Sequence, residues 1–421
     1  MGTKYDPCCG IDVHKDLLAA CVRRGDEEEV RTFGTTTTQI HELASWIRQN
    51  GCVLTTMEST GSYWIPVWNV FEEEEIPVRL ANAQFVKAIP GRKTDTKDAQ
   101  WLAELTQEGH VPASYVPPAR LRRIRALLTD LDCYKRDRTR LINRKQKIME
   151  TANLKLSSVV SDIRGKSAQY LLKWTLQNGA PSADDIRDMR AKKKISRRLH
   201  ASPEELSEAL NGIIAPEVRF EFEKCQELID FYDKTIAETW EYVTTLYTEH
   251  EKAGVRMLTQ IPGIGLESAY IIVGILGDDM SVFPSADHLC SWAGVAPGNN
   301  ESAGKRKSGK TTKGHALLKR LLVVCANSAV RAKNTFFAAR HKRLLVRKGY
   351  KKAIMAIAHS MLKVIYTMLS TGEAYEERGD NDYETRERER QFNAAVSNLP
   401  KLGVDASELT LPDEPFTVVV T

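Results

Sequence analysis

Four acidic residues stand where their carboxylates could meet to bind divalent cations. Asp12 lies in the β-type segment GIDVHK, and Glu58 ends the β-type segment VLTTME, each flanked by apolar strand residues. Asp95 and Asp98, in KTDTKDAQWLAEL, are three residues apart, which on a helix places both carboxylates on one face. Two metal ions about 4 Å apart need such hard oxygen ligands, because together they neutralise the attacking and leaving oxygens of a phosphodiester. These acids therefore predict metal-dependent phosphodiester chemistry.

Each acid also has an ordinary structural explanation. Asp95 could serve only as a helix cap or a partner of the helix dipole, and Asp98 could be an exposed ion-pair residue. All four acids occur together at positions that suit a metal cluster, and this favours metal binding over a separate structural role for each acid. We expect two Mg²⁺ ions, with Mn²⁺ as the alternative metal. Asp16, by contrast, is expected to be a turn residue.

The elements that must position these acids follow the order βββαβαβα. Short β-type runs open the chain in CCGIDVH, LLAACVRR and VRTFGTTT, separated by polar turns, which indicates an antiparallel meander. Apolar spacing then predicts a helix over 38–49, the strand VLTTME, a helix over 64–73 and the strand PVRLANA. A ribonuclease H-like fold has this order, with carboxylates at the ends of its first and fourth strands beside a late helix. The amino-terminal part is therefore predicted to be α/β.

Two amphipathic segments in the middle of the chain predict a pair of long helices. The segment 119–147 contains eleven Lys and Arg against three Asp, and a second apolar seam lies within 225–243. We expect the two helices to pair as an antiparallel coiled coil. Basic runs are often only solvated helix faces, but several together, with AKKKISRR at 191–198, favour nucleic-acid binding. The expected contact residues are Arg122, Arg123 and Arg144; the seams are Leu121, Ile124, Leu128 and Leu131, and Cys225, Ile229, Tyr232, Ile236, Trp240 and Val243.

A glycine-containing turn separates two helical segments in LTQIPGIGLESAYIIVGIL, residues 258–276. This pattern is typical of a helix-hairpin-helix, whose exposed backbone amides can hold a nucleic-acid phosphate. Gly263 and Gly265 are the expected contact residues. The alternative is an ordinary tight turn between two helices.

Residues 304–311 fit the P-loop pattern G-x-x-x-x-G-K-[ST], which holds phosphates in nucleotide hydrolases. A true P-loop follows directly on a buried strand, whereas Gly304 follows the loop-like segment GVAPGNNESA. The pattern therefore reflects a composition that suits any phosphate-binding loop. We expect no nucleotide cofactor.

Ser302 lies in the same loop, close to several cations. A serine hydroxyl becomes a nucleophile when a base or metal takes its proton and cations stabilise the charge that develops on the phosphate. Most loop serines only bond within turns, so this feature alone is weak evidence. The cations expected to contact nucleic acid are Lys305, Arg306, Lys307, Lys310 and Lys313.

The sequence resembles the DEDD transposases of bacterial insertion sequences, the insertion-sequence 110 family, which is associated with bridge-RNA-guided recombination. The resemblance covers about residues 8–375 and rests on GIDVHK, MESTGSYW, ANAQFVKAIPGRKTDTKDAQWLAEL, IPGIG and WAGVAPGNNESAGKRKSGKTTKGHALLKRLL, in that order. Many relatives carry Ser-Gly-Gly where this chain has Ser302-Ala303-Gly304, which leaves Ser308 as the less favoured nucleophile. By this resemblance the covalent nucleophile is Ser302, and the acids of a RuvC-like domain are Asp12, Glu58, Asp95 and Asp98.

The resemblance also implies a reaction and its partners. Ser302, of a neighbouring protomer and activated by metal ions that the acids hold, would attack a DNA phosphodiester. The phosphoserine link conserves bond energy, so a freed 3′-hydroxyl can reseal the strand without ATP. The implied partners are donor and target DNA, a structured bridge RNA that pairs with both, and further copies of the chain, as a dimer that assembles into a tetramer. Two other functions stay open: a metal-dependent hydrolytic endonuclease or Holliday-junction resolvase, and a non-catalytic nucleic-acid-binding relative.

Composition limits the remaining possibilities. With 421 residues, 42% of them hydrophobic, the chain can form about two to four domains. We see no run near the roughly 20 uninterrupted apolar residues of a membrane span and no secretory signal, so we expect a bacterial cytoplasmic protein, associated with the nucleoid when it acts. The eight scattered cysteines are expected to be reduced and mostly buried. The predicted parts are a catalytic domain over 1–115, a coiled-coil domain over 116–250, a mostly helical transposase domain over 251–375 and a charged tail over 376–421.

Overall fold

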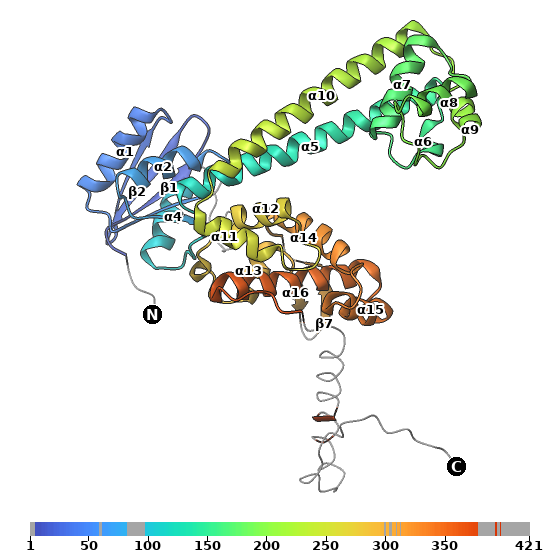
Figure 1. The fold of residues 1–421 in the computed structure, drawn as a ribbon. Coiled ribbons are helices and arrows are strands. Elements are labelled where there is room, and N and C mark those ends of the chain that lie inside the picture. Colours follow the sequence, from blue (N-terminus) through green and yellow to red (C-terminus); the bar gives the residue numbers. More distant parts are fainter. Residues whose placement is uncertain are drawn as a thin grey trace. The chain divides into compact units, whose positions relative to one another are not determined.

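The structure is a computed structural model of the 421-residue chain. It describes residues 5–58, 61–81, 97–298, 300–302, 305–308, 310–311 and 313–377, together with 392, 393 and 396. The chain divides into two compact units, Met1–Arg122 and Arg123–Thr421 (Figure 1). The division lies near the beginning of the long helix α5 (Ala119–Thr151).

The amino-terminal unit is built on a five-stranded mixed sheet with the strand order β3-β2-β1-β4-β5. Strand β2 is antiparallel to β1 and β3, whereas β4 is parallel to β1 and β5. The predicted meander and the strands that follow it are thereby confirmed, and the mixed sheet is consistent with a ribonuclease H-like domain. The strands are β1 (Cys8–Val13), β2 (Leu18–Arg24), β3 (Glu27–Phe33), β4 (Leu54–Glu58) and β5 (Val78–Ala81).

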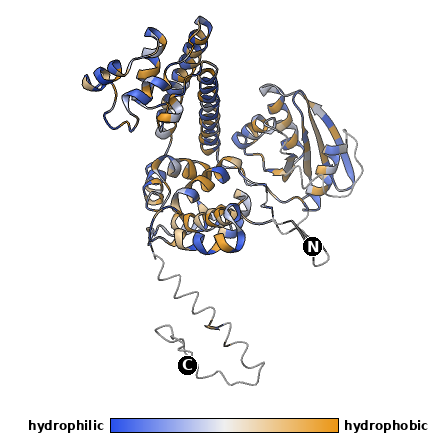
Figure 2. Ribbon diagram, turned by 90° about the vertical axis from the view of Figure 1, so that its right-hand side faces the viewer, coloured by the Kyte–Doolittle hydropathy of each residue, from blue (hydrophilic) through white to orange (hydrophobic). Residues whose placement is uncertain are grey.

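The two faces of the sheet are packed differently. Ile11 and Val13 point into the main core, together with residues of α1 (Thr37–Gln49) and α2 (Trp64–Glu73). The opposite face of β1 carries Gly10, where a Cβ would lie 2.3 Å from backbone atoms of α4 (Lys97–Gln107). Glycine therefore permits α4 to pack directly on the middle strand. The outer strand β3 is mostly exposed and hydrophilic (Figure 2).

The second unit is mostly helical in its described residues and contains two long helices that lie side by side (Figure 1). These are α5 and α10 (Pro216–Thr245). Their contacts step along the two helices in opposite directions, so the pairing is antiparallel, as predicted; a supercoil stays a prediction. Lys135 lies over the Trp240 ring at 5.8 Å, Arg138 pairs with Asp233, and Lys145 lies over the Phe222 ring at 4.2 Å.

The apolar seam at the beginning of α5 has a different partner from the predicted one. Ile124 and Leu128 are buried, and a Cβ added at Gly274 of α12 (Leu266–Leu276) would lie 3.0 and 2.7 Å from them. Because Lys135 is already opposite Trp240, near the end of α10, the earlier turns of α5 extend past α10 and pack on α12. The prediction that this part of the seam meets α10 is wrong.

A small helical subdomain connects the far ends of α5 and α10. Its core includes Leu171, Leu172 and Leu206, with residues from both long helices. Two of its helices begin with capping boxes, which satisfy the first backbone N–H groups: Ser182 with Asp185, and Ser202 with Glu205. The helices are α6 (Leu156–Val159), α7 (Lys166–Asn178), α8 (Ala183–Ala191) and α9 (Pro203–Ala209).

The carboxy-terminal helices pack around α16 (Tyr350–Thr371). By length and hydropathy alone α16 could cross a membrane, but its residues Ile357, Met361 and Ile365 are fully buried in the unit, as in the core helix of a globular protein. The eight cysteines are free and six of them are buried, as predicted. The other elements are α11 (Glu249–Leu258), the short 3₁₀ helix η1 (Met280–Val282), α13 (Ala286–Ala293), α14 (Ala316–Ala329) and α15 (Phe336–Lys348).

His315 gives the second unit a stability that depends on pH. Burial, and next the Arg125 cation, lower the pKa of His315 from 6.5 to about 4, and its Nδ1 accepts the Leu318 N–H at the start of α14. Because the folded pKa lies below the unfolded one, stability is complete above about pH 6.5 and falls as the pH drops toward 4. We expect a loss of up to about 2 kcal/mol near pH 5. His315→Asn retains an acceptor for the cap without titrating, so its unfolding temperature should fall less with pH; equal pH dependence in both proteins would contradict this assignment.

Candidate active site

Asp12 and Glu58 lie side by side at one edge of the amino-terminal sheet. The parallel strands β1 and β4 pair in register up to Ile11 and Met57, and the two acids are the next residues on their strands. The carboxyl ends of parallel strands meet at the same edge, and paired positions point to the same face. Since Asp12 is two residues after Gly10, both carboxylates lie on the face that α4 covers.

Both carboxylates are largely buried, with 6% of Asp12 and 7% of Glu58 exposed. Oδ2 of Asp12 lies 2.8 Å from Nε2 of His14, whose side chain is 57% exposed. Two neighbouring carboxylates at this depth repel each other unless cations or hydrogen bonds compensate their charge. His14 is not among the residues expected from the sequence; it directly follows β1, and its imidazole contacts the carboxylate two residues earlier.

Helix α4 packs on β1 in the opposite direction, on the face that carries the two strand acids. The Cys8 thiol donates to the Ala103 carbonyl at 3.3 Å, and Gly10 packs on Ala103 and Ala99, so residue numbers fall along α4 as they rise along β1. Two residues of strand, about 6.8 Å, exceed one helical turn of about 5.4 Å. The first turn of α4, which contains the half-buried Asp98, is therefore at the end of the helix nearest the carboxyl end of β1.

The described acids suit a divalent cation but do not complete its site. Carboxylates from β1, β4 and α4 are the hard oxygen ligands that Mg²⁺ and Mn²⁺ prefer. Over the described residues, which do not include Asp95, no three His, Cys, Asp or Glu side chains form a group that could hold a metal ion. Metal binding by the four predicted acids therefore stays a prediction.

Ser302 is the last residue of a short strand in the second unit. The strand β6 (Asn300–Ser302) pairs antiparallel with β7 (Lys305–Ser308), with Ser302 opposite Lys305. The ladder continues in the bridge between Pro297 and Thr311. The prediction of a loop is wrong here, because the P-loop-like residues 305–308 form one strand of a hairpin. Their extended backbone differs from a P-loop, whose successive amides curl around a phosphate. Residues 303 and 304 lie outside the described residues.

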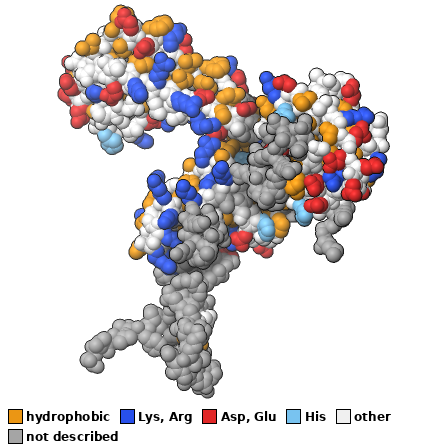
Figure 3. All heavy atoms as spheres, turned by 180° about the vertical axis from the view of Figure 1, so that it is seen from behind, with side chains coloured by type: hydrophobic (Ala, Val, Ile, Leu, Met, Phe, Trp, Pro, Cys, Tyr) orange, Lys and Arg blue, Asp and Glu red, His pale blue; other side chains and the backbone are white. Residues whose placement is uncertain are grey.

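The predicted nucleic-acid contacts differ in their exposure. Arg123, Arg144, Lys310 and Lys313 are exposed. The Arg122 side chain is only 11% exposed and donates to Glu72 Oε2 and Asn69 Oδ1, both at 2.7 Å, so within the amino-terminal unit its guanidinium is bound to α2. On the face shown in Figure 3, Lys and Arg side chains gather on the helical unit. Of the remaining cations, Lys305, Arg306 and Lys307, the structure describes the backbone, in β7.

The two glycines of the turn between α11 and α12 have different surroundings. Gly263 has φ +89°, and a Cβ there would lie 2.4 Å from the Cys325 carbonyl of α14. Gly265 precedes the first turn of α12, and no described atom lies within 4 Å of its Cβ position. Gly263 therefore packs the turn onto α14, while Gly265 leaves room beside the backbone. Phosphate binding by the turn stays a prediction.

Alanine substitutions at these glycines should have unequal effects on stability. Gly263→Ala forces a left-handed backbone and a steric overlap, so we expect a loss of about 1–3 kcal/mol and a lower unfolding temperature. Gly265→Ala has room for its methyl group and should cost less than about 1 kcal/mol, through the weaker helix cap. Thermal unfolding of both variants by circular dichroism measures the difference. Equal shifts would show that the close packing on α14 does not determine stability.

Two family models match separate parts of the chain. A model described as a transposase of the DEDD type matches residues 9–153, and a model described as "Transposase IS116/IS110/IS902 family" matches residues 255–342. The first range includes the four predicted acids, and the second includes Ser302. The transposase for insertion sequence element IS1111A of Coxiella burnetii is 24% identical over 375 residues, which are 87% of this chain and 90% of that protein.

Two further relatives match over shorter lengths. The 43.6 kDa protein of insertion element IS110 from Streptomyces coelicolor is 32% identical over 127 residues, which are 29% of this chain and 30% of that protein. The 42 kDa protein of insertion element IS900 from Mycobacterium paratuberculosis is 28% identical over 146 residues, which are 34% of this chain and 36% of that protein. These matches thus span about a third of each relative.

Proposed function

Because the chain belongs to the IS116/IS110/IS902 family of transposases, we propose that it cuts and rejoins DNA strands through a covalent link between Ser302 and a DNA phosphate. The observation that carries the proposal is the position of Asp12 and Glu58, buried side by side where β1 and β4 end and where α4 begins. Carboxylates placed in this way can supply the hard oxygen ligands that divalent cations need for phosphodiester chemistry.

The proposed role of the acids is to bind divalent cations. Asp12, Glu58, Asp95 and Asp98 would hold two ions, Mg²⁺ or alternatively Mn²⁺. Bound cations of this kind neutralise phosphodiester charge and lower the pKa of a hydroxyl nucleophile. His14, 2.8 Å from Asp12, restrains the orientation of that carboxylate.

The covalent step exchanges one phosphodiester for another. The Ser302 oxygen attacks the DNA phosphorus, the bond from phosphorus to the 3′-oxygen breaks, and the proton lost by the serine is balanced by the proton gained by the leaving oxygen. A 3′-hydroxyl of another strand then attacks the phosphoserine and releases Ser302 as the hydroxyl. No bond energy is lost, so the reaction needs no nucleotide. Cations of the hairpin, such as Lys305 and Lys310, would stabilise the phosphate as charge develops.

The proposed partners follow from the same reaction. Donor and target DNA are the substrates, and a structured bridge RNA that pairs with both would select the sequences. Exposed basic residues such as Arg123 and Arg144 would contact nucleic-acid backbones. The acids and Ser302 would come from neighbouring protomers of a dimer that assembles into a tetramer, in the bacterial cytoplasm at the nucleoid.

A covalent adduct tests the proposal. Incubation with labelled DNA and Mg²⁺, followed by denaturing electrophoresis, should reveal DNA that stays attached to the protein, and peptide mass spectrometry should locate the link at Ser302. Strand cleavage without an adduct would instead favour hydrolysis by water. Binding without cleavage under all metal conditions would favour a non-catalytic role.

A further inference from the structure

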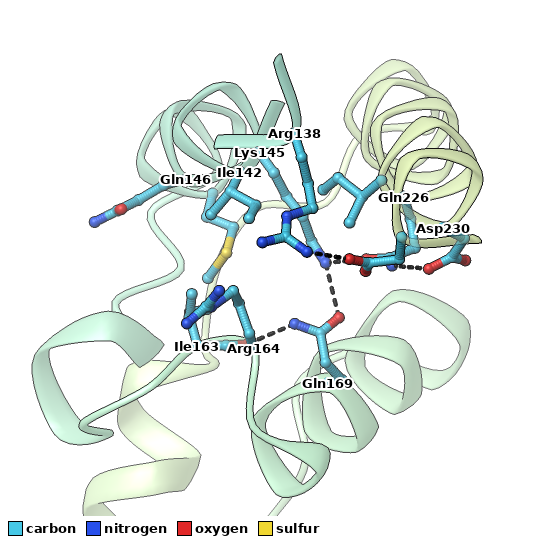
Figure 4. Close-up of a pocket in the computed structure, with 12 residues that line it drawn as sticks. Arg138, Ile142, Lys145, Gln146, Ile163, Arg164, Gln169, Gln226 and Asp230 are labelled. Carbon is cyan, nitrogen blue, oxygen red and sulfur yellow. Dashed lines mark hydrogen bonds and ion pairs between the residues drawn. The ribbon is translucent and has the colours of Figure 1, made fainter. Parts of the chain in front are cut away.

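A cavity of about 280 Å³ lies between the two long helices and the small helical subdomain (Figure 4). Helices α5 and α10 form two of its walls, and Ile163, Arg164 and Gln169 from the subdomain contribute the third. The volume is close to the lower limit of about 300 Å³ for small-molecule sites. The cavity is therefore suited to one small ring system.

Apolar and polar side chains line different parts of this cavity. Ile142 and Met149 of α5, Ile163, and Ile229 of α10 offer apolar surface. The charged lining residues are nearly balanced, with three cations, Arg138, Lys145 and Arg164, against two carboxylates, Asp230 and Asp233. A balanced lining disfavours a free phosphate, because the carboxylates would repel it.

Lys145 is the central polar group, and it is held in one position. Its side chain is buried, with 5% of the residue exposed, and its ammonium donates to Gln169 Oε1 at 2.8 Å and to Gln226 Oε1. Gln226 in turn donates from Nε2 to Asp230 Oδ1 at 2.7 Å. Burial lowers the pKa of Lys145 to about 8. Burying a cation costs folding free energy, and an apolar residue of similar size would pack this position equally well.

Arg138 and Arg164 complete the polar lining. The guanidinium of Arg138 forms an ion pair with Asp233, and within the described residues its buried Nε has no hydrogen-bond partner. Arg164 has a side chain that is 59% exposed. Figure 4 shows the side chains of Arg138, Lys145 and Gln169 directed toward one another. The cavity thus presents fixed donors and acceptors next to apolar surface.

We propose that this cavity binds a single unpaired nucleobase of a nucleic-acid strand. An unstacked base needs apolar surface for its faces and both donors and acceptors for its edge, and the cavity provides all three. The choice of a base among small ring systems rests on the proposed action on nucleic acid. The binding itself is independent of Ser302 and of the acids.

Methyl NMR of the full chain tests this proposal, because three Ile and one Met side chain of the lining are direct probes. Protein labelled at Ile and Met methyl groups is titrated with nucleoside monophosphates, with ribose 5-phosphate and with inorganic phosphate. We expect the signals of Ile142, Met149 and Ile229 to shift with the nucleotides alone. Equal shifts with ribose 5-phosphate or phosphate would indicate an anion site, and no shift with any nucleotide would also overturn the proposal. Short ribo- and deoxyribo-oligonucleotides of one sequence then distinguish an RNA base from a DNA base.

A variant that fills the cavity without changing the net charge tests whether the base binds there. Ile142→Trp should remove the nucleotide-induced shifts of Met149 and Ile229 and lower nucleotide affinity by about tenfold or more, the loss expected for one stacked base. Leu228→Trp is the matched control, because Leu228 is on α10, is 48% exposed and does not line the cavity. Retained shifts in Ile142→Trp would contradict the proposal. If Ile142→Trp does not fold, the wild-type titration still decides whether the cavity binds a base. Failure to find the covalent DNA adduct would contradict the proposed function but not the binding of a base in this cavity.

Discussion

An Asp12→Asn substitution is expected to lower DNA strand cleavage by about a thousandfold or more without unfolding the protein. Asparagine keeps the size of the side chain and can still accept a hydrogen bond from His14, but it removes the charge that would hold a divalent cation. Because asparagine matches aspartate in size at this buried position, the unfolding temperature without metal should stay close to that of the wild type. Cleavage of labelled DNA with Mg²⁺ and thermal unfolding measure the two effects.

Two further variants sharpen this test. Asp16→Asn makes the same substitution at a nearby exposed residue and should cleave at the wild-type rate. The double variant Asp12→Asn/Glu58→Gln should lose little more activity than Asp12→Asn alone, because both carboxylates would serve one metal site. Normal cleavage by Asp12→Asn would exclude this edge of the sheet as the catalytic site. Additive losses would show that the two acids act independently.

The strand order of the amino-terminal unit could be predicted because its signals are local. Strands β1, β2 and β4 contain short apolar runs bounded by polar turns, and the order of helices and strands then leaves few topologies open. Asp12 and Glu58 were recognisable because each stands at the carboxyl end of an apolar strand. The contact between His14 and Asp12 joins residues only two apart in sequence, so it too is a local feature.

Other features depend on contacts between distant segments, which periodicity does not reveal. The apolar spacing of Ile124 and Leu128 is the same whether α10 or α12 covers them. The offset between the long helices determines which of the two does. In the sequence, Arg122 resembles the other cations of a basic helix. Its guanidinium nevertheless donates hydrogen bonds to Glu72 and Asn69, about fifty residues earlier in the chain. The hairpin of β6 and β7 is polar throughout, so it lacks the alternation that marks a half-buried strand.

A Ser302→Ala substitution is expected to abolish the covalent DNA adduct and to reduce strand transfer by at least about a thousandfold, since no other group would replace a lost nucleophile. Affinity for DNA should change little, because the variant keeps every cation of the hairpin. Denaturing gels measure the adduct, and filter binding measures the affinity. Full cleavage activity in Ser302→Ala would favour a water nucleophile and a hydrolytic enzyme.

Ser308→Ala is the matched control for this experiment. Ser308 is paired with Asn300 at the other end of the same hairpin, and the ladder that joins the strands consists of backbone groups, which both substitutions preserve. A difference between the two variants therefore reports the chemistry of one hydroxyl and not the folding of the hairpin. Loss of the adduct in Ser308→Ala alone would move the nucleophile to β7, six residues later in the chain, while leaving the covalent mechanism in place.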